Sequence, residues 1–378
     1  MTEQRVILVD GVAGYWGGRV AERLSAEPDL HVIGLDTQLP QQGSGIDFIQ
    51  AEIRNSLLME LLKEEKVHTY VHLAFVENDR PSETAFESNV MGTMKVLSAC
   101  AEAQVKRVVL KSSTLIYGAG PGNSAFLRED HPLNAKRNFG TLRDLIEIEN
   151  FCTGFRSQSP EVQLTLLRFA NIIGPTVDSP LTRFLRNDTA PLLLGFDPVI
   201  QVIHEEDVVN ALVHAAIYDV PGIYNVAAQG AMPLFKLTGL AGKFPVPVLH
   251  PIAYLGESLL GSQFTPIDFD YFRYPCVGDL RRMREDLEFA PAYQAEEAVR
   301  DFVARRKHKA AASALTPQEA EEERLRLIIE RRKSIRQQTA RGVPARAQPR
   351  GRPAVEVGAD LDGGAESADS DLYEEESQ

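Results

Sequence analysis

The sequence contains little cysteine and no arrangement of cysteine or histidine that would bind a metal. Its three cysteines, Cys100, Cys152 and Cys276, are far apart, odd in number and without CxxC spacing. The eight histidines are also scattered, and the pair His68 and His72 lies in a strand-like segment, where four residues span about 13 Å. We therefore expect buried thiols in a reducing compartment, no disulfide framework and no metal site.

Long apolar runs are absent as well. A membrane-spanning helix needs about 18 unbroken apolar residues, and the most apolar stretch in the C-terminal part, residues 244–260, is interrupted by Pro245, Pro247 and Pro251. At the other end, a strand pattern starts at Arg5 and leaves no room for a charged segment followed by an apolar signal core. We expect no membrane association and a cytoplasmic location.

Cationic residues are outnumbered. Among 378 residues, 53 Asp and Glu face 40 Lys and Arg, which gives a formal net charge of −13. Residues 305–340 carry +5 and residues 341–378 carry −5, so residues 1–304 hold the whole −13. Nucleic acids and anionic lipids require clustered cations, so neither is expected as a partner.

Short apolar runs alternate with amphipathic segments through the first half of the chain, in the order of repeated βαβ units. Runs such as VILV and VVL are apolar at successive positions, which is typical of strands covered on both faces. Strands are expected at 5–10, 30–36, 48–51, 69–75, 107–110 and 163–169, and long helices at 82–103 and 139–155. The pattern predicts an α/β protein with a Rossmann-type, doubly wound parallel sheet.

This alternation becomes irregular after Gly174-Pro175. We expect residues 1–175 to form the Rossmann domain and residues 199–228 to complete it, with strands at 199–203 and 222–226. Outside these segments, the pattern stays irregular and proline and aromatic residues are frequent. Residues 176–198 and 229–304 are therefore predicted to form a smaller mixed lobe that holds the substrate.

The C-terminal part has a different composition. Thr316 and Pro317, followed by acidic residues, predict the start of a helix that runs to Gln338 within a basic extension, residues 305–340. Residues 341–378 are rich in Pro, Gly and acidic residues and are expected to be a disordered acidic tail. The helix binds a protein partner, lies against the body of the protein, or is a solvated extension.

A glycine-rich loop follows the first strand. In VDGVAGYWGGRV, Gly11, Gly14 and Gly17 have GxxGxxG spacing and open the first helix. They suit a tight turn, close approach to a pyrophosphate and close helix packing, and the helix start supplies N–H groups for the anion. Asp36 ends the second strand, 19 residues after Gly17, where a carboxylate accepts hydrogen bonds from a ribose diol. Because it would repel a 2′-phosphate and no Arg follows closely, NAD(H) is favoured over NADP(H).

Further motifs occur in a fixed order along the chain. They are AEIRN, VHLAF, NVMGTMKVLSAC, SSTLIYG, LRFANIIGP, IHEEDVVNAL and GIYNVAA. With the glycine loop, they make residues 5–305 resemble an extended short-chain dehydrogenase/reductase of the NAD-dependent epimerase/dehydratase type.

The resemblance implies roles for individual residues. The cofactor set, besides the glycines and Asp36, is Glu52 and Ile53 beside the adenine, Leu73, Ala74 and Phe75 in the cofactor channel, and Asn89 on the active-site side of its helix. Ser113, four positions before Tyr117, aligns with the catalytic Ser or Thr, and Asn171 aligns with a residue that contacts substrate.

The chain departs from the family pattern at the proton-transfer pair. Where the family has Tyr-x-x-x-Lys, this sequence has NFGTLRD, which places Phe139 at the tyrosine position and Arg143 at the lysine position. A phenol exchanges the proton that accompanies hydride transfer, and Phe139 has no proton to exchange. Arg143 retains a positive charge that could serve the nicotinamide ribose. Tyr117 or a water would have to replace the phenol.

A second departure concerns the substrate. Family members acting on nucleotide sugars carry an Arg that clamps the diphosphate, and the corresponding residue here is Ile200. Arg183 or Arg186 could replace it from the smaller lobe, or remain solvated surface residues.

Three functions stay open at this point. The first is an NAD(H)-dependent epimerase, dehydratase or reductase of a sugar or nucleotide-sugar substrate. The second is a catalytically silent NAD(H)-binding sensor, and the third is a scaffold that binds a protein through the C-terminal helix. Family members pair through the two long helices, so a homodimer is expected, with Met91, Met94, Leu142, Leu145 and Ile146 as interface or core residues.

Overall fold

The computed structural model describes residues 4–40, 46–137, 139–249 and 268–314. The chain divides into two compact units, residues 1–311 and residues 312–378. The helix predicted at 316–338 and the tail predicted at 341–378 lie outside the described residues. Within the described part, no helix is long and apolar enough to cross a membrane.

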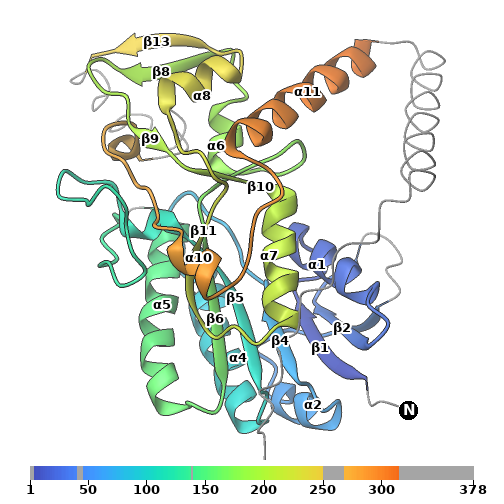
Figure 1. The fold of residues 1–378 in the computed structure, drawn as a ribbon. Helices are drawn as coiled ribbons and strands as arrows, with labels where there is room; N and C mark the ends of the chain where they lie inside the picture. Colours follow the sequence, from blue (N-terminus) through green and yellow to red (C-terminus); the bar gives the residue numbers. More distant parts are fainter. Residues whose placement is uncertain (1–3, 41–45, 138, 250–267, 315–378) are drawn as a thin grey trace, which may run out of the picture. The chain divides into compact units, whose positions relative to one another are not determined.

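A seven-stranded parallel sheet forms the centre of the unit (Figure 1). Its strands, in spatial order, are β11 (Gly222–Val226), β6 (Gln163–Phe169), β5 (Arg107–Ser113), β4 (Thr69–His72), β1 (Arg5–Asp10), β2 (Leu30–Asp36) and β3 (Asp47–Gln50). The chain starts in β1, moves to one edge through β2 and β3, and then crosses to β4 and the other edge. This reversal of direction is the doubly wound topology, and the predicted fold class is confirmed.

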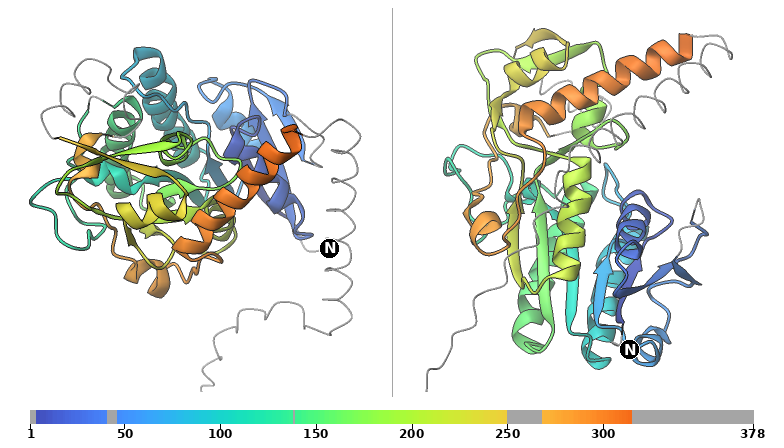
Figure 2. Two further views of the ribbon diagram at one scale, coloured as in Figure 1. Left: turned by 90° about the horizontal axis from the view of Figure 1, so that it is seen from above. Right: turned by 45° about the vertical axis from the view of Figure 1, so that its right-hand side comes forward.

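Helices cover both faces of this sheet (Figure 2). On one face lie α1 (Tyr15–Ser25) and α7 (Glu205–Ile217), and on the other lie α2 (Leu58–Glu64), α4 (Gly92–Glu102) and α5 (Gly140–Gln158). Strand residues alternate between the two layers: Val9 and Val109 pack with α1 and α7, whereas Leu8 and Val108 pack with the opposite helices. Burial on both faces explains why these strands are continuous apolar runs.

A second core belongs to the segments after β6. It gathers the parallel pair β8 (Thr189–Leu193) and β13 (Phe244–Val248) with helices α6 (Pro180–Phe184), α8 (Leu234–Leu240) and α11 (Ala295–Ala314). The 3-10 turns η2 (Thr114–Tyr117) and η4 (Phe269–Phe272) pack against the same core, and α10 (Arg281–Glu285) lies against β11. The domain boundaries given above remain a prediction.

The strand predicted at 199–203 does not join the main sheet. It is divided into β9 (Val199–Ile200), which pairs with β12 (Met232–Pro233), and β10 (Val202–His204), which pairs with β7 (Asn171–Ile173). Gln201 lies between them and is buried, with its side chain bonded in both directions to the backbone of Gly278. Gln201 therefore links the chain to the backbone of Gly278 at the point where the strand is divided.

The helix predicted at 82–103 is also interrupted. It consists of α3 (Glu83–Phe86), one π-helical turn, η1 (Glu87–Met91), and then α4. In that turn Asn89 is fully buried, accepts a hydrogen bond from Val76 N at 2.8 Å and donates to Val76 O at 2.9 Å. The turn therefore fixes the loop after β4.

Candidate functional site

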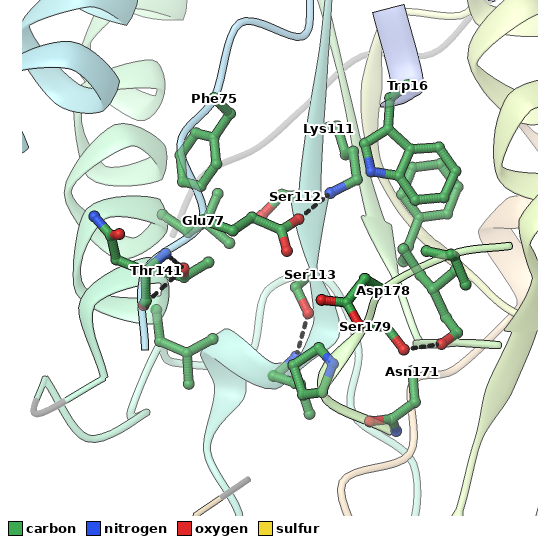
Figure 3. Close-up of a pocket in the computed structure, with 18 of the residues that line it drawn as sticks. Trp16, Phe75, Glu77, Lys111, Ser112, Ser113, Thr141, Asn171, Asp178 and Ser179 are labelled. Atoms are coloured by element: carbon green, nitrogen blue, oxygen red, sulfur yellow. Dashed lines mark hydrogen bonds and ion pairs between the residues drawn. The ribbon is translucent and has the colours of Figure 1, made fainter. Parts of the chain in front are cut away.

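A cavity of about 600 Å³ opens at the carboxyl ends of the strands. One side consists of the start of α1 and the ends of β4 and β5, and the other of residues 169–183 with Asp268 and Tyr271. In open parallel sheets, ligands bind in the crevice outside the carboxyl ends of the strands, where the strand order reverses. Figure 3 shows the side chains that point into this cavity.

The glycine loop is as tight as its spacing predicts. Gly11 has φ +67°, and a Cβ there would lie 2.7 Å from Ala74 N. A Cβ on Gly17 would lie 2.1 Å from Gly11 O, so α1 begins in direct contact with the turn. Gly14 lines the cavity and is the N-cap of α1, with no side-chain capping bond. The loop thus presents an uncapped helix start to the cavity, which is the arrangement that binds phosphate anions.

Asp36 connects the end of β2 to this loop. Its carboxylate accepts hydrogen bonds from Ala13 N at 2.9 Å and from Gln38 N at 3.0 Å, one on each oxygen. Thr37 Oγ1 also lies 3.5 Å from Oδ1. A carboxylate has about four lone-pair sites, so acceptor capacity remains, mainly on Oδ2, for a ligand diol. Nearby, Ile53 is buried against Gly92, and Glu52 pairs with Arg54 at 2.5 Å.

The carboxylate of Asp10, which the sequence analysis did not identify, is buried beside the glycine loop and holds the backbone after β4 in place. Asp10 is fully buried and accepts bonds from Tyr70 Oη at 3.0 Å, from Leu73 N at 2.5 Å and from Ala74 N at 2.7 Å. His72 Nδ1 lies 2.5 Å from the same carboxylate. Asp10 therefore fixes the backbone of the predicted cofactor channel after β4, while the side chains of Leu73 and His72 line the cavity.

Phe139 lies in the cavity at a position set by the start of α5. Thr141 N and Oγ1 both donate to Asn78 O, and a Cβ on Gly140 would lie 2.3 Å from Arg80 O. The helix start is thus pressed against the loop after β4. Phe139 and Ser113 are both lining residues, and the Ser113 hydroxyl accepts a bond from Leu115 N at 3.2 Å. The structure brings the predicted catalytic serine and the phenylalanine into one cavity.

Arg143 points elsewhere. Its guanidinium donates to Asp144 Oδ1 at 2.9 Å and to Ser82 O at 2.9 Å, and lies 4.9 Å from the centre of the Phe86 ring. Asp144 in turn accepts a bond from Asn89. Neither Arg143 nor Asn89 is among the described residues that line the cavity.

A lysine that the sequence analysis did not single out lies in the cavity instead. Lys111 is on β5, two residues before Ser113, and its Nζ lies 3.5 Å from Glu77 Oε1 and 5.4 Å from the centre of the Trp16 ring (Figure 3). Residues two apart on a strand share a face. A charged residue directly after the apolar run 108–110 was the signal that could have identified Lys111.

The lobe after β6 contributes an arginine and an amide. Arg183, on α6, pairs with Asp79 at 3.0 Å and with Asp178 at 3.3 Å, and its buried Nε has no hydrogen-bond partner. Asn171 donates to Gln201 O at 3.0 Å. Both line the cavity, so the two predicted substrate residues lie in the same space as Ser113.

Two tyrosines also line the cavity, and neither resembles an activated phenol. Burial raises the pKa of Tyr15 to about 12, and its hydroxyl lies 2.7 Å from Thr176 Oγ1. Burial also raises the pKa of Tyr271 well above its usual value, and its hydroxyl donates to Leu115 O. Tyr117 is fully buried outside the lining set, and burial raises its pKa to about 12. A proton-transfer phenol needs the opposite shift.

A second, apolar cavity adjoins the first at Asn171. Its volume is about 20 Å³, and its wall includes Ile200, Phe184, Leu234 and Phe272. A space of this size holds about one water molecule. Thus the region around Ile200 is packed with apolar side chains.

The predicted residues therefore fall into two groups. Those that line the cavity are Gly14, Leu73, Phe75, Ser113, Phe139, Asn171 and Arg183. Those outside the lining set are Gly11, Gly17, Asp36, Glu52, Ile53, Ala74, Asn89 and Arg143. Across the described residues, no group of three or more His, Cys, Asp or Glu could hold a metal ion.

Structures with the same fold include several nucleotide-sugar enzymes. UDP-glucose 4-epimerase from Thermotoga maritima, solved with UDP-glucose, matches with a TM-score of 0.62 and 19% identity, over 81% of this chain and 99% of that chain. The corresponding enzyme of Thermus thermophilus, solved with NAD, has a TM-score of 0.62 and 20% identity, over 80% of this chain and 99% of that chain. A tyrosine-to-phenylalanine variant of UDP-glucuronic acid 4-epimerase from Bacillus cereus, solved with NAD and a UDP-fluoro sugar, has a TM-score of 0.61 and 18% identity, over 80% and 99%.

Sequence comparison gives the family. An uncharacterised protein of Mycobacterium tuberculosis is 32% identical over 312 residues, which are 79% of this chain and 83% of the relative. UDP-glucose 4-epimerase of Lactobacillus helveticus is 27% identical over 184 residues, or 46% of this chain and 54% of the relative. The model of the NAD dependent epimerase/dehydratase family matches residues 7–227. With the doubly wound sheet and its glycine loop, these matches show that the chain belongs to the NAD dependent epimerase/dehydratase family.

Proposed function

We propose that this protein binds NAD(H) at the carboxyl edge of the main sheet and holds a small sugar-like substrate beside Ser113. The observation that carries the proposal is the glycine loop, where a Cβ on Gly17 would meet Gly11 O at 2.1 Å. Only a chain without side chains at these positions can bring the helix start of α1 so close to the end of β1. The residues present therefore fit a dinucleotide, with its pyrophosphate at the α1 start.

The choice of NAD(H) over NADP(H) rests on Asp36. Its carboxylate retains acceptor sites for a ribose diol, and its negative charge disfavours a 2′-phosphate. The carboxylate also holds Ala13 N in the glycine loop, so the ribose site and the phosphate site share one support.

Polar side chains on the walls of the cavity support the proposal of a hydroxylated substrate. Ser113, Thr141, Asn171 and Ser179 all line the cavity and offer short donors and acceptors (Figure 3). These groups are suited to sugar hydroxyls. The nucleotide-sugar enzymes with the same fold support this substrate class.

A nucleotide diphosphate on the substrate has weaker support. The apolar packing around Ile200 offers no cation, so Arg183 would have to bind the diphosphate. Arg183 is paired with Asp79 and Asp178, which an anionic substrate would have to displace.

The cofactor, when bound, supplies a hydride acceptor or donor. Around it, Ser113 Oγ would donate to the substrate oxygen, and the ring of Phe139 would pack against the ligand without exchanging a proton. The second candidate function, a catalytically silent NAD(H) sensor, is favoured by this ring and by the raised pKa values of Tyr15 and Tyr271, both caused by burial.

Binding can be tested through the single tryptophan of the chain, Trp16, which lines the cavity. Addition of NADH should quench Trp16 fluorescence in a saturable manner and give energy transfer to the reduced nicotinamide, and NADPH should bind more weakly. Failure of NADH to bind the full-length chain, in fluorescence and in calorimetry, would refute the proposal.

Turnover separates the two candidate functions. Sugar and nucleotide-sugar ligands are screened with NAD⁺ for reduced-nicotinamide absorbance and for isotope exchange at the sugar carbons, with the wild type and Phe139→Tyr. Phe75→Tyr, which adds a hydroxyl elsewhere in the same cavity, is the matched control. Exchange only in Phe139→Tyr, with a gain of about 10²-fold or more, would identify a silent binder. Equal exchange in all three proteins would identify an enzyme that needs no phenol.

We also propose a homodimer formed through α5 and the helical segment α3–η1–α4, with Met91 in η1. Leu142, Leu145 and Ile146 are buried within the protomer and belong to its core, but Met91 is 50% exposed. Light scattering should give twice the chain mass for the wild type and a shift toward the monomer for Met91→Lys. A monomeric wild type would refute the dimer.

A further inference from the structure

Arg143, which aligns with the lysine of the family pattern, does not line the cavity, because Asp144 and Ser82 O hold its guanidinium. Among the described lining residues, the basic side chains are His72, Lys111 and Arg183. His72 lies between Asp10 and Thr93, at 2.5 and 2.9 Å. Arg183 is bound by two aspartates at the far wall of the cavity.

Lys111 is held more weakly than His72 or Arg183. Among the described residues its ion pair is with Glu77, at an N···O distance of 3.5 Å, and the Glu77 side chain is 45% exposed. The Lys111 side chain is 19% exposed, so most of it is enclosed by the cavity wall. An ammonium group in this setting can exchange a half-exposed carboxylate for a ligand oxygen at low cost, because an ion pair with an exposed carboxylate is weak.

The position of Lys111 connects the two ends of the cavity. Its ammonium lies 5.4 Å from the ring of Trp16, which is two residues beyond Gly14 at the start of α1. On its other side, Ser113 lies two residues further along the same strand and on the same face of the sheet. If the pyrophosphate of a dinucleotide lies at the start of α1 and its nicotinamide ring lies near Ser113, the nicotinamide ribose lies beside the Lys111 ammonium.

We propose that Lys111 is a cofactor-binding residue that donates hydrogen bonds to the nicotinamide-ribose half of NAD(H), in place of a cation at position 143. Glu77 holds the ammonium in place and competes with the cofactor for it. The inference rests on the proposed NAD(H) site and assigns one side chain within it.

The test compares two probes on matched variants by calorimetry. NADH carries the nicotinamide ribose, whereas ADP carries only the adenosine half and its phosphates. Lys111→Met should weaken NADH binding about 10-fold to 100-fold, the usual range for a hydrogen bond to a charged group, and leave ADP binding unchanged. Lys111→Arg should restore most of the loss. Lys95→Met, on the exposed side of α4, is the matched control and should match the wild type for both probes.

Two further variants sharpen the result. Glu77→Gln should strengthen NADH binding a few-fold, because it removes the competing carboxylate. Arg143→Met should change NADH affinity less than Lys111→Met does. If Lys111→Met binds NADH as the wild type does, or if Arg143→Met causes the larger loss, the assignment is wrong while the proposed NAD(H) site stands. If the wild type binds neither NADH nor ADP, the site itself is wrong, and the assignment falls with it.

Discussion

The two ends of the cavity are built in different ways. At the phosphate-loop end, defined by Gly11, Gly14 and Gly17, the proposed ligand groups are backbone N–H groups, and the geometry is set by steric contact between backbone atoms. At the proton-transfer end, defined by Ser113 and Phe139, the groups that face the cavity are side chains. The difference shows why a fold can retain a nucleotide loop while its chemistry changes. A side chain can be replaced without moving the sheet, whereas a change in the loop also moves the sheet.

The strongest test of the comparison removes the support beneath the proton-transfer end. Arg168 is buried and bonded to Glu149 at 2.5 and 2.9 Å, and Glu149 accepts a bond from Ser112. Arg168→Met would leave the Glu149 carboxylate buried and unpaired, so the free energy of unfolding should fall by about 3–5 kcal/mol. Denaturant unfolding measures the loss.

The matched control for this change is the double variant Arg168→Met/Glu149→Leu. It removes both charges and should lose less stability than Arg168→Met alone, because no uncompensated charge remains. If Arg168→Met has the same free energy of unfolding as the wild type, the ion pair does not support the end of β5.

The next largest effect is expected at the phosphate-loop end. Gly17→Ala introduces a Cβ 2.1 Å from Gly11 O, so the loop or the helix must move. Overpacking of this kind costs about 1–3 kcal/mol, and we expect NADH affinity to fall up to about 100-fold.

Gly154→Ala makes the same substitution where nothing lies within 4 Å of the new Cβ, in the interior of α5. It should leave NADH affinity unchanged and stabilise the helix by up to about 1 kcal/mol. Equal affinities for the two alanine variants would refute the backbone account of this end.

The same contrast explains what the sequence could predict about the fold. The strands of the main sheet are apolar on both faces, so Arg5–Asp10, Leu30–Asp36 and Gln163–Phe169 were located correctly by pattern alone. The interruption at Gln201 was not predictable, because its partner is the backbone of Gly278, far along the chain. The π-helical turn at Asn89 likewise depends on a loop that lies 13 residues away.

At the site, spacing predicted the glycine loop, and the family resemblance singled out Ser113 and Phe139, which both line the cavity. The direction of the Arg143 side chain did not follow, because it depends on Asp144, Ser82 and Phe86 around it. A long side chain can turn toward either side of its helix, and only the surrounding contacts decide which.

A third prediction concerns the carboxylate at the adenosine side. Asp36→Ala should lower NADH affinity about 10-fold, since it removes hydrogen bonds between the ribose and a charged group. NADPH affinity should fall less or rise, because the repulsion of the 2′-phosphate is also removed. Asp36→Asn keeps an acceptor for Ala13 N and separates loop support from charge. An unchanged ratio of the two affinities would remove Asp36 from the ribose site.

Phe139→Tyr is expected to have the smallest effect on cofactor binding, although of these substitutions it would change the chemistry of the cavity most. Phe139→Tyr adds one hydroxyl to a ring that already lines the cavity, at a helix start fixed by Thr141 and Gly140. The phosphate loop and Asp36 are untouched, so NADH affinity should stay within about twofold, less than 0.5 kcal/mol. Fluorescence titration of Trp16 measures it, with Phe75→Tyr as the control for an added hydroxyl. A tenfold change for Phe139→Tyr alone would mean that the two ends of the cavity are energetically coupled, and a proton-transfer group could not then have been lost from this chain without cost to cofactor binding.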